Sequence, residues 1–195
     1  GDAFRYCKSL THFEFPEKVT SISVEVLRFC DNLKSVVFHG NVTSIEDYAF
    51  ESCYNLQEIK IPENVTFLGN SAFSGCRLTS IVIPKNVNNI GTECFYYCSS
   101  LRAVYFLGMS NPSYGSNVFT NTLVTCGYVL PEYQDSNFCG LPVGMFPTQI
   151  FSATQIFTFS SLFTFSEAFS SSFGFLPSHQ FTQSLEFSST SKFTE

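Results

Sequence analysis

A period of 22 or 23 residues runs through the first half of the chain. Each copy has a large apolar side chain, a cysteine three residues later, and a leucine two or three residues after the cysteine. The cysteines of five successive copies are Cys7, Cys30, Cys53, Cys76 and Cys98. Because so short a unit cannot enclose its own apolar side, successive units must stack and share one continuous core.

Each repeat predicts a strand followed by a turn and a short helical piece. Phe13 and Phe15 alternate with polar residues, which is typical of a strand with one buried face. Ala49, Phe50 and Cys53 have the i, i+1, i+4 spacing of a buried helical side. Strands of neighbouring repeats would lie about 4.8 Å apart. We therefore predict an α/β repeat solenoid, built as a stack of short parallel strands and short helical turns.

The repeat has a specific consensus that resembles a known family. The cycle x-Ala-Phe-x-x-Cys-x-x-Leu-x-x-Ile-x-Ile-Pro-x-x-Val-Thr-x-Ile, clearest from Ala49 to Leu68, is similar to the leucine-rich repeats of the BspA-like class. Two copies depart from it, with Val26-Leu27 and Cys94-Phe95 in place of Ala-Phe. Proteins of this class are microbial surface proteins and adhesins. The resemblance therefore implies a leucine-rich-repeat stack displayed at the cell surface or outside the cell.

The composition divides the chain into two parts. Residues 1–143 are predicted to be the solenoid, in which residues 107–143 form a divergent cap. Residues 144–195 form a low-complexity tail, rich in Ser and Thr, with a phenylalanine at every sixth position from Phe151 to Phe193. We expect this tail to be an extended or disordered stalk open to O-glycosylation, with a β-forming segment as the alternative. A membrane span is disfavoured because the tail is too polar.

The chain starts in mid-repeat and ends within a hexad, so we expect it to be a fragment of a longer protein. A signal peptide or membrane anchor would then lie outside it, and any membrane association would go through such a segment.

Charge and motifs argue against several classes of function. The formal net charge is −6 and no basic run occurs, which disfavours nucleic acid as a partner. No Gly-rich phosphate loop, G-x-S-x-G or H-E-x-x-H motif is present, so we expect no enzyme activity, no cofactor and no metal. His12, His39 and His179 are interpreted as surface residues.

The column of cysteines is interpreted as a ladder of small buried side chains. Cys126 and Cys139 lie outside the column and are the candidate disulfide pair in an oxidising compartment. Cys94 and Cys98 alone make a poor zinc site. Two N-glycosylation sequons, at Asn41 and Asn64, fall at one repeat position, although Val-Thr belongs to the consensus in any case.

The solvent-facing positions of the strands add up to one extended face, which is where a solenoid binds its partners. One row of this face is predicted to carry Glu14, Val37, Lys60, Val82 and Tyr105. Apolar and aromatic residues in solvent-facing positions commonly mark an interaction site, the alternative being scattered surface residues without a role.

The row and the resemblance together predict a non-enzymatic, surface-displayed module. Its partner would be a protein or glycoprotein, on a host cell or in the matrix, in cell adhesion. An intracellular scaffold for protein–protein interaction is the main alternative, and a repeat-bearing enzyme regulator is a third reading.

Overall fold

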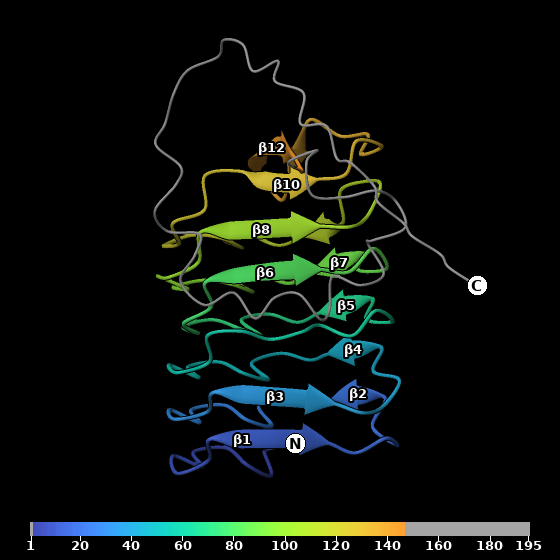
Figure 1. The fold of residues 1–195 in the computed structure, drawn as a ribbon. Coiled ribbons are helices and arrows are strands. Elements are labelled where there is room, and N and C mark those ends of the chain that lie inside the picture. The colour runs from blue at the N-terminus through green and yellow to red at the C-terminus, as the bar shows by residue number, and fades with distance from the viewer. Residues whose placement is uncertain (1, 147–195) are drawn as a thin grey trace, which may run out of the picture. The chain divides into compact units, whose positions relative to one another are not determined.

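The computed structural model describes residues 2–146, which fold as one β-solenoid with each repeat forming one coil (Figure 1). We call each coil a rung. Residues 144–146 belong to this solenoid, and the phenylalanine hexads lie outside the described residues.

One side of the stack is a parallel sheet, called here the long-strand face. Its strands are β1 (His12–Phe15), β3 (Ser35–Phe38), β6 (Ser80–Ile83), β8 (Ala103–Phe106), β10 (Gly127–Val129) and β12 (Leu141–Met145). Phe13 pairs with Val36, and Ile81 pairs with Val104, so residues one period apart are neighbours across the strands. This register confirms the sequence alignment of the repeats.

The long-strand face is interrupted at residues 58–61, which do not form a strand. The face therefore consists of the pair β1–β3 and the series β6–β8–β10–β12. Ile61 nevertheless remains buried, and the Thr79 N–H still donates to the Gln57 carbonyl over 3.1 Å. The inward-facing residue Ile61 of the third repeat thus stays in the core, although this repeat forms no strand on the long-strand face.

A second parallel sheet is formed by two-residue strands. The first four of them are the last two residues of the consensus Val-x-x-Ile segment. Its strands are β2 (Ser21–Ile22), β4 (Ser44–Ile45), β5 (Phe67–Leu68), β7 (Asn89–Ile90) and β9 (Ser113–Tyr114), paired in that order. The second residue of the first four strands is fully buried, because it faces the core shared by all rungs.

The predicted helical turns are wrong, because no helix occurs in residues 2–146. Alternate amides in this part of each repeat donate instead to carbonyls of the next rung. For one rung these bonds are Tyr48 to Asn70 at 2.9 Å, Phe50 to Ala72 at 2.8 Å and Ser52 to Ser74 at 2.7 Å. A helix is about 10 Å wide with its side chains, whereas strands lie about 4.8 Å apart, so stacked helices would spread the rungs on this side. The observed turns instead let neighbouring rungs lie at about the strand spacing on this side of the solenoid.

Two residues of each turn adopt positive φ, which a right-handed helix does not permit. The first position is occupied by Glu25, Tyr48, Ser71, Glu93 and Asn117. The second turn position, as we call it, is occupied by Tyr6, Phe29, Ser52, Gly75, Tyr97 and Asn121. Both positions recur with the repeat, so the unusual backbone is a property of the fold.

Stacked phenylalanine rings run through the core. Phe50 and Phe73 have ring centroids 5.3 Å apart, and Phe73 to Phe95 and Phe95 to Phe119 are each 5.4 Å. The interplanar angles are 4° or 5°, so equivalent rings lie flat on one another. Phe119 therefore belongs to a further rung, although its repeat lacks the cysteine.

The C-terminal cap closes the stack with a change of strand direction. Strand β11 (Asn137–Phe138) pairs antiparallel with β12, whose other neighbour β10 is parallel to it. Phe138 is fully buried, and its ring centroid lies 4.8 Å from that of Phe106. The cap also contributes strand β10 at Gly127–Val129 to the long-strand face, and Val118–Phe119 lie in a β-solenoid turn like those of the earlier rungs.

Phe73→Ala is expected to lower the free energy of unfolding by about 3–5 kcal/mol, because it leaves a cavity between two stacked rings. Glu58→Ala is the control, since its side chain is exposed, and it should change stability by about 0.5 kcal/mol or less. Urea denaturation followed by circular dichroism measures both. Equal losses would contradict the assignment of inward and outward positions.

Candidate functional site

The solvent-facing row of the long-strand face is the candidate site. The structure pairs Glu14 with Val37, and Val82 with Tyr105, as neighbours across strands. Val37 is 37% exposed, while Val82 and Tyr105 are half-buried. Lys60 is exposed and makes no ion pair among residues 2–146, and it lies in the interrupted segment 58–61. The predicted row is therefore two paired groups separated by this segment.

An aromatic cluster occupies the C-terminal end of the row. Tyr105 pairs with Tyr128, with ring centroids 5.2 Å apart, and the ring of Phe146 lies 5.4 Å from that of Tyr105. Burial is the main cause that raises the pKa of both tyrosines, so their phenols stay neutral at physiological pH. The sequence-based row ended at Tyr105, although Tyr128 is one period further on.

A charged cluster occupies the N-terminal end of the row. Glu14 lies between two histidines: its Oε1 is 2.9 Å from His12 Nε2, and its Oε2 is 2.9 Å from His39 Nε2. His12 also contacts the Ser35 hydroxyl through Nδ1 at 2.7 Å. Hydrogen bonding to His12, and then to His39, lowers the Glu14 pKa, so this carboxylate is ionised at neutral pH.

The sequence predicted surface histidines, as observed for His12, but the cluster with Glu14 was not predicted. A signal was present, because His39 lies 25 residues after Glu14, close to one repeat. No group of three or more metal-binding side chains occurs in the described part of the chain.

The cysteine column forms a hydrogen-bonded ladder inside the solenoid. Four of the five thiols donate to a carbonyl of the preceding rung: Cys30 to Phe4 at 3.1 Å, Cys53 to Leu27 at 3.3 Å, Cys76 to Phe50 at 3.2 Å and Cys98 to Phe73 at 3.1 Å. Burial raises the pKa of Cys30 and Cys98 to about 12. These thiols are therefore poor nucleophiles and poor metal ligands.

The candidate disulfide partners are both free thiols in the structure. Cys126 is half-buried beside Tyr105 and Tyr128, whereas Cys139 is buried near Cys94. The two cysteines thus have different surroundings, and a Cys126–Cys139 disulfide in an oxidising compartment stays a prediction.

The two sequons lie side by side on adjacent rungs. Asn41 and Asn64 are both exposed, and the Asn64 amide donates to the Asn41 side-chain oxygen. The hydroxyls of Thr43 and Thr66 donate to carbonyls of the preceding rung, at 3.1 and 3.2 Å. The threonines therefore have a structural role, and N-glycosylation of the two asparagines stays a prediction.

The family model of the BspA type leucine rich repeat region matches this chain in six copies, over residues 1–102 and 26–127. The chain belongs to this family. Residues 2–146 of this BspA-type protein contain no helix that could cross a membrane. The search of curated proteins found no match.

Two solved structures of bacterial leucine-rich-repeat proteins have a similar fold. A T. pallidum protein is 24% identical, with a TM-score of 0.56, over 66% of this chain and 63% of that one. A protein from Bacteroides ovatus is 20% identical, with a TM-score of 0.54, over 74% of this chain and 54% of that one. The aligned region spans less than two thirds of either relative.

A thiol reagent added to the native protein is expected to modify Cys7 and Cys126 first, because they are only half-buried. The column thiols should react only on unfolding, and they should then titrate without a reductant. Mass spectrometry of the labelled peptides measures both stages. A disulfide between Cys30 and Cys53, or rapid native labelling of Cys76, would contradict the ladder.

Proposed function

We propose that this chain is a non-enzymatic module that binds a protein or glycoprotein through its long-strand face, displayed on the cell surface in adhesion. The observation that carries the proposal is the row from Glu14 and Val37 to Val82, Tyr105 and Tyr128. Membership of the BspA-type family supports a binding role. We further propose that the module lies at the cell surface, that its partner is on a host cell or in the matrix, and that it acts in adhesion.

The two ends of the row suit different parts of a partner. Tyr105 and Tyr128 offer half-buried, stacked aromatic surface, and the buried ring of Phe146 packs against Tyr105. Tyrosine is among the residues that contribute most to binding energy at protein interfaces. Glu14 with its two histidines offers a polar end that orients a partner by hydrogen bonds and charge. We therefore expect a partner surface with an apolar centre and basic or polar groups to one side.

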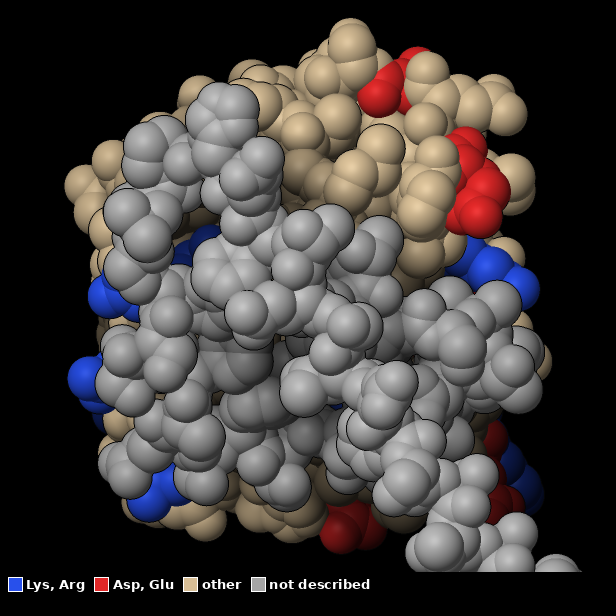
Figure 2. All heavy atoms as spheres, turned by 45° about the horizontal axis from the view of Figure 1, so that its top comes forward, with Lys and Arg blue, Asp and Glu red and all other residues tan. Residues whose placement is uncertain are grey.

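The hydrogen-bonded rungs hold this face in place before any partner arrives. A preformed surface avoids much of the entropy that a flexible segment loses on binding. This argument favours the solenoid over the phenylalanine hexads as the recognition surface. Nucleic acid is disfavoured by the net charge of −6 and by the Lys and Arg side chains seen in Figure 2, which are separated by other residues.

The triple variant Val37→Ser, Val82→Ser, Tyr105→Ser is expected to weaken binding by at least about tenfold, because it removes apolar contact area at the proposed interface. The full chain, fluorescently labelled, is titrated on cultured animal cells and on immobilised extracellular-matrix protein. Native hydrogen exchange verifies that the variant keeps its fold.

The control is Val24→Ser with Tyr6→Ser, which removes exposed apolar side chains away from the long-strand face. Its binding should match that of the original chain. Loss of binding in the control alone would place the interface elsewhere. Absence of binding by the original chain to every cell and matrix surface would contradict adhesion and favour the intracellular scaffold.

A further inference from the structure

A hollow lies on the turn side of the solenoid, at the second turn position. Tyr6, Phe29 and Tyr97 fill this position in three rungs with aromatic side chains. Ser52 and Gly75 occupy it in the two rungs between Phe29 and Tyr97. The small residues lie in the lining of a depression of about 660 Å³.

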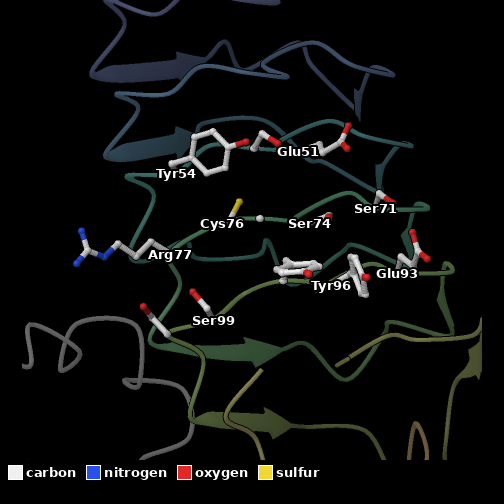
Figure 3. A pocket seen from close by; sticks show the side chains of 13 residues that line it. Glu51, Tyr54, Ser71, Ser74, Cys76, Arg77, Glu93, Tyr96 and Ser99 are labelled. Atoms are coloured by element: carbon white, nitrogen blue, oxygen red, sulfur yellow. The ribbon is translucent and has the colours of Figure 1, made fainter. Parts of the chain in front are cut away.

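Tyrosines border the hollow, and small polar side chains form its floor (Figure 3). Tyr54 and Tyr96 lie on opposite sides with Ser74 between them, and Ser71 and Glu93 lie at one end. Tyr97 also lines the hollow, and its ring meets that of Tyr96 edge-on, with centroids 4.7 Å apart and an interplanar angle of 82°. Because the Tyr96 and Tyr97 rings are nearly perpendicular, their faces point in different directions.

The polar groups of the lining are available for a ligand. The hydroxyls of Tyr54, Tyr96 and Tyr97 and the carboxylate of Glu93 make no side-chain hydrogen bond or ion pair among residues 2–146. Tyr54 and Tyr97 are 52% and 57% exposed. Glu51, by contrast, is held in an ion pair with Arg28. The hollow therefore presents three phenol hydroxyls and one free carboxylate beside exposed aromatic rings.

The backbone around the hollow argues against an extended peptide as the ligand. The Ser52 and Gly75 amides donate to Ser74 and Tyr96 of the following rungs, at 2.7 and 2.8 Å. An added strand needs unpaired backbone groups, and these amides are already used. Polar and apolar groups share the lining about equally, so it lacks the apolar pocket that anchors a large side chain of a partner protein.

We propose that this hollow is a binding site for a neutral oligosaccharide. Sugar rings carry apolar C–H faces that pack on tyrosine rings and hydroxyls that bond to carboxylate, serine and phenol oxygens. The volume falls in the range of about 300–1,000 Å³ that is usual for small-ligand sites. Of the charged side chains in the lining, Glu51 is paired with Arg28, and Glu93 and Arg77 carry opposite charges, so the hollow has no excess charge that would select an acidic or basic sugar. The site is separate from the long-strand face and does not depend on the function proposed for it.

A tyrosine at position 75, as in the equivalent position of Tyr97, would fill the hollow and block the site. A Cβ atom added at Gly75 would lie 3.5 Å from Ser52 Cα and 3.6 Å from the Tyr54 ring, which is ordinary contact. Tyr97 adopts positive φ at the equivalent position, so the backbone there accommodates a tyrosine. Gly75→Tyr therefore places a ring in the hollow, and its backbone carries the same kind of positive-φ strain that Tyr97 already carries in its own rung.

The test is saturation-transfer NMR with the full chain and linear trisaccharides of glucose, mannose, galactose and N-acetylglucosamine. At least one is expected to bind, with its C–H protons receiving most of the transfer. Gly75→Tyr and Tyr97→Ser should each reduce the affinity by at least about tenfold, because each removes a ring contact or its space. Tyr6→Ser is the matched control, because Tyr6 has the same repeat position and is 55% exposed.

Binding that survives Gly75→Tyr, equal loss in Tyr6→Ser, or no binding by any of the four trisaccharides would overturn the proposal. A heparin oligosaccharide that binds better than all of them would overturn the neutral class. The triple variant of the long-strand face should keep its sugar binding, so failure at one site is distinguishable from failure at the other.

Discussion

The hydrogen bond between rungs on the turn side is the interaction on which the rest of the structure depends. Each rung is closed by a segment in which alternate amides, such as those of Leu27, Phe50 and Phe73, donate to the next rung at 2.8–3.0 Å. The turn side therefore keeps close to the strand spacing, as the ring centroids 5.3–5.4 Å apart show. Parallel strands on the other side can then pair in strict register.

The same spacing explains why the core uses a few residue types at fixed positions. Equivalent phenylalanine rings lie parallel with centroids 5.3–5.4 Å apart, and a wider spacing of the turns would separate them. Cysteine fits the column beside the rings because it is small, apolar and a weak donor, and its S–H reaches a carbonyl of the preceding rung. Polar side chains also link the rungs: the Asp47 carboxylate accepts from the Asn70 backbone N–H at 2.6 Å, and the Asn70 side-chain oxygen accepts from the Thr92 backbone N–H at 2.9 Å.

The repeat period made most of this fold predictable from the sequence. The alignment of Phe13 with Val36 and of Ile81 with Val104 placed the strands in their observed register. The helical turns were predicted wrongly because Ala49, Phe50 and Cys53 are buried in either geometry. The spacing of buried residues in the sequence does not reveal whether a backbone amide forms its hydrogen bond within its own segment or with the next rung.

The candidate site was predictable only in part. The row on the long-strand face follows from strand alternation, and its pairing of Val82 with Tyr105 is observed. The Glu14 cluster and the hollow beside Gly75 were missed, because both depend on side chains from several rungs converging at one place. In the hollow the decisive feature is a missing side chain, which becomes visible only against the aromatic residues of equivalent rungs.

Native-state hydrogen exchange by NMR tests the central claim most directly. If the turns are bonded between rungs, the Phe50, Phe73 and Phe95 amides should exchange only through the same large opening as strand amides such as Val104. The free energies of exchange of these three turn amides should then agree with each other and with those of the strand amides. Fast exchange of the three turn amides beside well-protected strands would contradict the account, because the turn side would then not hold the rungs together.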